Sequence, residues 1–91
     1  MDYQRIILLG KTTDKIELKQ GKKGTPYAEF GVTVAQGKDE AILFPVILFG
    51  GSAEEADAVL SKGDRILVEG SLAIEWETGK FKVLSSTFRR L

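Results

Sequence analysis

Hydrophobic residues in this chain recur with a two-residue period, which is the spacing of β-strands. Between Ala28 and Val34 an apolar residue occupies every second position, with Glu29, Gly31 and Thr33 between them. This alternation predicts a half-buried strand over Tyr27–Ala35. The same reasoning predicts further extended segments at Arg5–Leu9, Ile16–Leu18 and Arg65–Trp76, and a last strand beginning at Lys80–Val83. Turns are predicted at Gly10–Asp14, Gly21–Gly24, Gln36–Glu40 and Glu77–Gly79.

The segment Ile42–Gly50 (ILFPVILFG) departs from this alternation, because Leu43 through Phe49 are apolar at every position. Successive residues of a strand face opposite sides, so such a run predicts a strand that is covered on both faces. A chain of 91 residues has too little protein to cover both sides of a sheet. The second face is therefore expected to meet a partner, which could be another subunit, a ligand or flat bases.

One short helix is predicted at Ala53–Leu60. Ser52 and Glu55 have the spacing of a capping box, and Gly63 suits the left-handed position just past a helix end. With Ile16–Leu18 counted as a short resumption of the first strand, the chain thus contains three strands, a helix and two strands. This order predicts an all-β fold, a five-stranded Greek-key OB-fold barrel with one short helix between strands 3 and 4. Residues 1–91 are expected to form a single domain of this kind.

The amino-acid composition narrows the range of functions that the chain could have. Cysteine and histidine are absent, so disulfides, thiolate metal sites and the commonest general base are excluded. We therefore predict a binding protein and not an enzyme, with no metal, cofactor or small-molecule substrate. No apolar run approaches the roughly 18 residues of a membrane span, which favours a cytoplasmic protein. The net charge is zero, but acidic residues concentrate in positions 39–64 and basic residues towards both ends, which allows a local basic groove.

Several motifs occur in a characteristic order: RIILLGK, KIELK, FGVTVA, PVILFGG and, after the helix, KGDRILVEGSL. In order and spacing they resemble the bacterial single-stranded DNA-binding protein family over nearly the whole chain. The resemblance implies a homodimer or homotetramer of OB-folds that binds single-stranded DNA with little sequence specificity. Such a protein stacks bases on aromatic side chains, contacts phosphates through Lys and Arg, and protects unpaired strand in replication, recombination or repair. A nucleoid-associated location in the cytoplasm is implied as well.

The resemblance extends to individual residues. Phe49 matches the base-stacking aromatic of the family's hydrophobic-aromatic-Gly motif, and Trp76 lies close to a second aromatic position. Arg5 and Lys11 match positions at the start of the first strand and in a turn near DNA. The remaining candidates for nucleic-acid binding are Tyr27, Lys80 and Lys82. For each aromatic, a place in the core or in a subunit contact is the alternative interpretation.

The first strand is the candidate oligomer interface. Its apolar residues Ile6, Ile7, Leu8 and Leu9 show the same two-faced character as the central run. The resemblance implies that this strand pairs across a two-fold axis. Such a contact would also cover an apolar edge that is prone to aggregation.

Four departures from the family pattern are visible, and the first three reduce the expected number of stacking sites. Trp76 follows Gly70 by six positions instead of seven, which would turn it to the opposite face unless a bulge intervenes. Leu43 stands where the family has an aromatic, and the Gln36–Glu40 loop is short. The family's acidic C-terminal tail is missing, so we expect no recruitment through a tail. The alternative function is an oligomerisation or protein-interaction module of the replication-restart type, with weak or no nucleic-acid binding.

Overall fold

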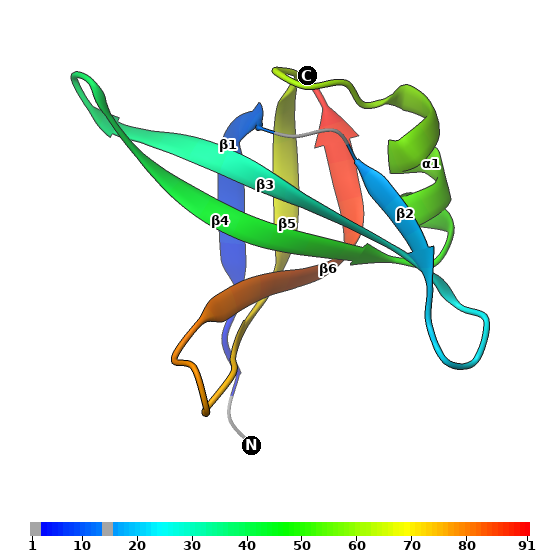
Figure 1. The fold of residues 1–91 in the computed structure, drawn as a ribbon. Coiled ribbons are helices and arrows are strands. Elements are labelled where there is room, and N and C mark those ends of the chain that lie inside the picture. Colours follow the sequence, from blue (N-terminus) through cyan, green and yellow to red (C-terminus); the bar gives the residue numbers. More distant parts are fainter. Residues whose placement is uncertain (1–2, 14–15) are drawn as a thin grey trace.

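The computed structural model describes residues 3–13 and 16–91, which form six strands and one helix (Figure 1). In chain order the elements are β1 (Ile6–Thr12), β2 (Glu17–Gln20), β3 (Pro26–Gly37), β4 (Glu40–Phe49), α1 (Gly51–Val59), β5 (Arg65–Ile74) and β6 (Phe81–Arg90). No helix in this part of the chain is long and apolar enough to cross a lipid bilayer.

The strands form one closed barrel. Their order in the sheet is β1-β5-β6-β4-β3-β2, and the barrel closes where β1 also pairs with β3, at Lys11↔Thr33 and Thr12↔Val32. β2 pairs with the next stretch of β3, at Glu17↔Glu29 and onwards. β1 and β2 are therefore two pieces of one barrel strand. The predicted class is confirmed, a five-stranded barrel with a helix between its third and fourth strands.

Several predicted boundaries were wrong. β1 continues through Gly10 to Thr12, and not into a turn, because these residues pair with β5 and β3. Asp14, predicted in the same turn, lies outside the described residues. β5 ends at Ile74 and not at Trp76. The connecting turn is closed by two backbone hydrogen bonds, from Gly79 N to Glu75 O and from Glu75 N to Lys80 O, both 2.8 Å long.

The predicted capping box does not form. Helix α1 begins at Gly51, with Gly50 as its N-cap at a positive φ of 72° and no side-chain cap. The Ser52 hydroxyl donates instead to the Ser86 carbonyl oxygen at 2.5 Å, which attaches the helix to β6. Gly63 does have a positive φ of 89°, but it lies in the turn after Leu60, the C-cap. The Leu60 N–H donates to the Ala56 carbonyl oxygen, which completes the last turn of the helix.

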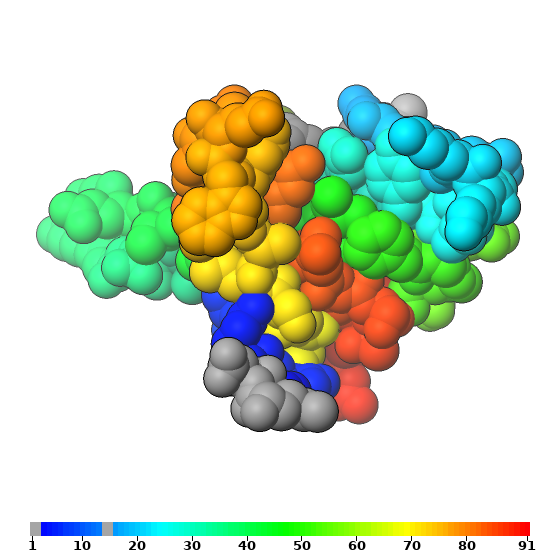
Figure 2. Space-filling view, turned by 90° about the horizontal axis from the view of Figure 1, so that it is seen from below, coloured from blue at the N-terminus to red at the C-terminus, as the bar shows by residue number. Residues whose placement is uncertain are grey.

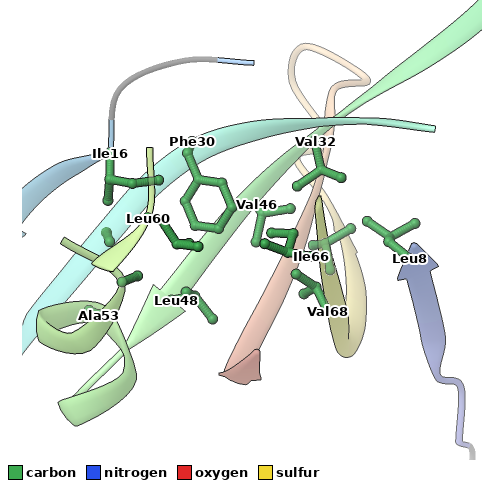
Figure 3. Packing of buried hydrophobic residues seen from close by; sticks show 13 residues of the cluster. Leu8, Ile16, Phe30, Val32, Val46, Leu48, Ala53, Leu60, Ile66 and Val68 are labelled. Carbon is green, nitrogen blue, oxygen red and sulfur yellow. The ribbon is translucent and has the colours of Figure 1, made fainter. Parts of the chain in front are cut away.

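The barrel interior is filled by side chains from every strand except β2, with Ile16 contributed from just before β2 (Figure 3). The central run contributes Val46 and Leu48, which are fully buried, while Leu43 and Phe49 on its other face are exposed. Helix α1 covers one end of the barrel with Ala53 and Ala56. The core consists of Leu8, Ile16, Ala28, Phe30, Val32, Val46, Leu48, Ala53, Ala56, Leu60, Ile66, Val68 and Val83.

Two glycines allow strands to approach closely. A Cβ added at Gly10 would overlap the carbonyl oxygen of Thr33, and one added at Gly70 would overlap that of Leu84. Gly10 lies where β1 turns from β5 towards β3, and Gly70 lies at the register shift between Glu69 and Ser71. Both positions are bends of the barrel, where the absence of a side chain lets backbones meet.

Thr12, the last residue of β1, is hydrogen-bonded to the loop between α1 and β5. It is almost fully buried, and its hydroxyl donates to the Ser61 carbonyl oxygen at 2.7 Å and accepts from the Asp64 N–H at 3.1 Å. Its backbone N–H donates to Asp64 O at 2.9 Å, and its carbonyl oxygen accepts from Gly63 N–H at 2.8 Å. Four hydrogen bonds of this one β1 residue thus attach the connection between α1 and β5 to the barrel.

We predict that Gly10→Ala will lower the free energy of unfolding by about 1–3 kcal/mol, because the added methyl group forces backbones apart at the closure. Gly37→Ala is the matched control, since a Cβ there meets nothing within 4 Å. We expect that control to change stability by less than about 0.5 kcal/mol. Chemical denaturation followed by circular dichroism measures both. Equal stabilities of the two variants would show that the contact at Gly10 is not restrictive.

Candidate nucleic-acid interface

The outer face of β3 and β4 carries two of the predicted aromatics side by side. Tyr27 and Phe49 are directly opposite each other in the antiparallel register. Both point away from the core, because their neighbours Ala28 and Leu48 are fully buried. Phe49 is 41% exposed, so its ring is available to a partner. The structure therefore brings these two candidates together on one surface.

Next to this pair lies a hollow in the outer surface, which we call the β3–β4 hollow. It is lined by Glu17, Glu29, Phe30, Gly31, Leu43, Pro45, Val46, Ile47 and Lys82. In register, Glu29 faces Ile47 and Gly31 faces Pro45. Figure 2 shows the β5–β6 turn (orange) and the β2–β3 loop (cyan) as two separate projections, with part of β4 (green) between them.

Trp76 and Lys80 lie in the β5–β6 turn. Trp76 is 91% exposed, and no ring contact with the described residues fixes it on the barrel. Because β5 ends before Trp76, the alternation of side chains along the strand does not determine which way Trp76 points. Beside the turn, Phe81 packs edge-on against Phe44, with ring centroids 5.7 Å apart. The turn thus presents a single aromatic on a projection of the surface.

The basic candidates occupy different positions. Lys82 lines the β3–β4 hollow directly. Lys11 faces Thr33 in register, and Thr33 faces Leu43 of the hollow, so Lys11 lies around the barrel from it. Of the three candidate lysines, Lys82 is the one that lines the hollow, while Lys80 lies in the β5–β6 turn.

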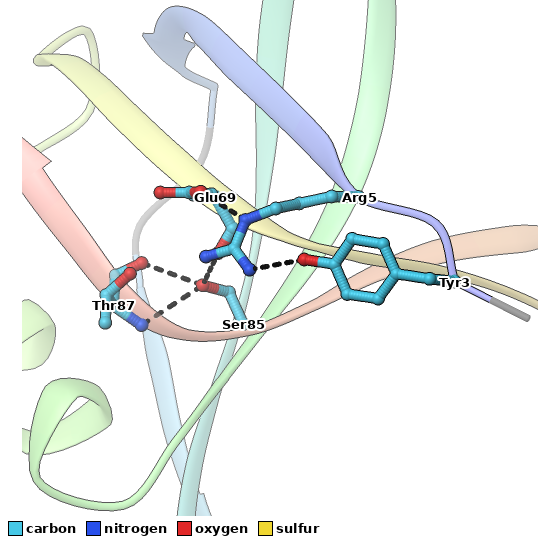
Figure 4. A network of polar contacts seen from close by, with 5 residues as sticks. All are labelled: Tyr3, Arg5, Glu69, Ser85 and Thr87. Carbon is cyan, nitrogen blue, oxygen red and sulfur yellow. Dashed lines mark hydrogen bonds and ion pairs between the residues drawn. The ribbon is translucent and has the colours of Figure 1, made fainter. Parts of the chain in front are cut away.

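Arg5 is engaged elsewhere. Its Nε pairs with the Glu69 carboxylate and its Nη1 donates to the Tyr3 hydroxyl at 2.9 Å (Figure 4). The hydrogen bond to Tyr3, followed by the hydrogen bond and charge of Glu69, raises the pKa of Arg5 above its ordinary value. Arg5 therefore stays cationic, but its charge is matched within the chain.

Two carboxylates in the hollow were not among the predicted site residues. Glu17 and Glu29 face each other across β2 and β3, and Lys19 Nζ lies between them, 3.6 Å and 3.5 Å from one oxygen of each. The charge of Glu29 is the main cause that raises the pKa of Lys19. Glu29 alternates with buried residues in the strand pattern, so its outward direction was readable from the sequence. Its neighbours in the hollow depend on the register between strands, and this register could not be predicted from the sequence.

The candidate oligomer contact on β1 needs a correction. The four residues do not form one surface: Ile7 and Leu9 are 63% and 47% exposed, whereas Leu8 is 4% exposed and belongs to the core. Ile6 is partly buried and packs against the core as well. β1 is thus an ordinary alternating strand, and only Ile7 and Leu9 remain as outward candidates.

A closed five-stranded barrel with this helix placement defines the chain as an OB-fold. Among solved structures it is similar to the wild-type single-stranded DNA binding protein from Thermus aquaticus. The TM-score is 0.85 at 26% identity, covering 98% of this chain and 40% of that one. An SSB domain from Synechococcus sp. has the same TM-score at 20% identity, over 98% of this chain and 97% of that one.

The sequence comparisons identify the family. The model of the single-strand binding protein family matches residues 3–85. The single-stranded DNA-binding protein of Wolinella succinogenes is 37% identical over 82 residues, covering 80% of this chain and 50% of the relative. That of Helicobacter pylori is 33% identical over 89 residues, covering 86% and 50%. The chain therefore belongs to the single-strand binding protein family, and it spans about half the length of these curated relatives.

Because Trp76 is the chain's one tryptophan and is largely exposed, we predict an emission spectrum like that of indole in water. Acrylamide should quench this emission nearly as strongly in the folded protein as in the unfolded chain. Steady-state fluorescence with and without denaturant measures both properties. Blue-shifted, protected emission in the folded state would place the ring in a contact that the isolated chain does not have.

Proposed function

We propose that this chain binds single-stranded DNA on the outer face of β3 and β4. The observation that carries the proposal is the pairing of Tyr27 with exposed Phe49 beside a hollow that Lys82 lines. Aromatic rings stack on any base at about 1–3 kcal/mol per base, which suits binding without sequence readout. Membership of the single-strand binding protein family supports the same function. Trp76, on its projecting turn, is positioned to stack a further base.

The proposed action is passive. DNA bound only in its unpaired form shifts the duplex equilibrium towards open strands by mass action, with no turnover. Phosphates lie along Lys11, Lys80 and Lys82, while Arg5 contributes less because Glu69 already pairs with it. Among the described residues, no group of three or more acidic side chains could hold a metal ion. In this proposal, protection of unpaired strand on cytoplasmic nucleoid DNA is the role in replication, recombination or repair.

The outward residues of β1 support a proposal about assembly. Ile7 and Leu9 are exposed, and residues 6–9 pair with β5 along one edge of the strand only. Leu67 lies opposite Leu9 on β5 and is partly exposed, which enlarges the apolar surface. We propose that a second copy covers this surface and edge, giving a homodimer or, by a further contact, a homotetramer. Covering both removes an edge that could otherwise pair with unrelated chains.

We predict that Phe49→Ala will weaken binding to an oligo-dT strand by about 1–3 kcal/mol while leaving its salt dependence unchanged, because stacking releases no counterions. Lys82→Ala should instead reduce the slope of log K against log salt by about 0.7 for each phosphate that is no longer neutralised. Fluorescence anisotropy of labelled DNA at several salt concentrations measures both. Lys62→Ala, in the loop between α1 and β5, is the control for removal of a lysine. Unaltered affinity of the Phe49 variant would refute stacking on this face.

We expect Ile7→Glu to reduce the mass of the assembly to that of a smaller species, because a carboxylate cannot be buried unpaired between two copies. Light scattering after size-exclusion chromatography measures the mass. Val59→Glu on α1 replaces another exposed aliphatic side chain and should leave the mass unchanged. A wild-type chain that remains monomeric at every concentration would exclude the proposed contact.

A further inference from the structure

The β3–β4 hollow has walls of opposite charge. Glu17 and Glu29 lie on β2 and β3 at one side, and Lys82 lies on β6 at the other. β4 separates β3 from β6 in the sheet order, so the strands that carry Glu29 and Lys82 are two strand spacings apart, about 10 Å. A partner that enters this hollow therefore meets acceptors at one end and a cation at the other.

The acidic wall keeps a net negative charge. Within residues 3–13 and 16–91, Lys19 is the single cation in contact with Glu17 and Glu29, and it is shared between them. Glu29 contacts it through Oε2 at 3.5 Å, and its side chain is 42% exposed. Phosphate is repelled from such a wall and attracted to Lys82. These charges would orient a nucleotide in the hollow with its phosphate towards β6 and its base towards Glu29.

The floor between the walls suits a flat ring. It is formed by Pro45 and Ile47 of β4, with Gly31 of β3 opposite Pro45. Because glycine has no side chain, nothing projects from β3 at this point. A base that lies on this floor presents its edge to the Glu29 carboxylate.

An ionised carboxylate only accepts hydrogen bonds. Cytosine offers it the N4 amino group, whereas thymine has the O4 acceptor at the equivalent position. Resting on the proposed function, we propose that the β3–β4 hollow takes a base with an exocyclic amino group and that Glu29 disfavours thymine there. Glu29 is thus a specificity-determining residue within a site that otherwise binds by stacking. The preference is local, since it applies to one base of each bound segment.

The test compares oligo-dC and oligo-dT of equal length, at one salt concentration and at mildly alkaline pH, where cytosine tracts do not associate. These two pyrimidines offer rings of similar size, so the ratio of their dissociation constants isolates the edge contact. We expect the wild-type chain to bind oligo-dC about tenfold more tightly, the scale of one amino–carboxylate contact. Glu29→Gln should bring the ratio close to one. Glu54→Gln, on α1 and outside the hollow, should retain it.

The outcomes separate this inference from the proposed function. If the wild-type chain binds both strands equally and Phe49→Ala weakens that binding, the proposed selectivity is wrong but the proposed binding site is retained. A dC preference that persists in Glu29→Gln would also overturn the assignment to Glu29. Binding of neither strand, even at low salt, would refute the proposed function itself. Thermal unfolding of each variant confirms that a change in the ratio does not come from misfolding.

Discussion

Closure of the barrel at Thr12 is the constraint on which the rest of the structure depends. Here β1 leaves β5 and joins β3, and the connection after α1 is attached through both the hydroxyl and the backbone of Thr12. A hydroxyl that is buried must be hydrogen-bonded, and this one both donates and accepts. If the closure were lost, the sheet would open and the interior of Val32, Val46 and Ile66 would meet water. A small chain has no second layer to protect it.

Closure also creates two distinct outer surfaces from strands that each have one face on the core. On β3 and β4 the outward residues include aromatic, apolar and charged side chains around a hollow. On β1 and β5 they include exposed aliphatic side chains beside a strand edge. The excess of apolar residues in the sequence is thus divided between two places. In our proposals the first surface binds flat bases with their phosphates, and the second binds another copy of the chain.

The order of strands and helix could be predicted from the sequence because alternation depends only on local chemistry. The inward positions of the central run could not be predicted in this way, because Leu43 through Phe49 are apolar at every position. Leu8 was assigned to an interface because an all-apolar stretch hides which residues face inward. The Ser52 capping box failed because β6, far along the chain, offered the hydroxyl a better acceptor. The position of Trp76 depended on where β5 ends, and strand ends are set by partner strands. The hollow required register between four strands, which no single segment encodes.

The sheet order has a consequence for biosynthesis. β1 is made first, yet its main partner is β5, and β6 lies between β5 and β4. During translation the ribosome therefore releases a hairpin of β3 and β4 well before the barrel has anything to close around. Non-local pairings of this kind slow folding and leave strand edges exposed in the meantime. Barrel closure in a nascent chain requires β6. A ribosome that stalls before β6 would therefore release a product with an open sheet, whose exposed strand edges can pair with other chains.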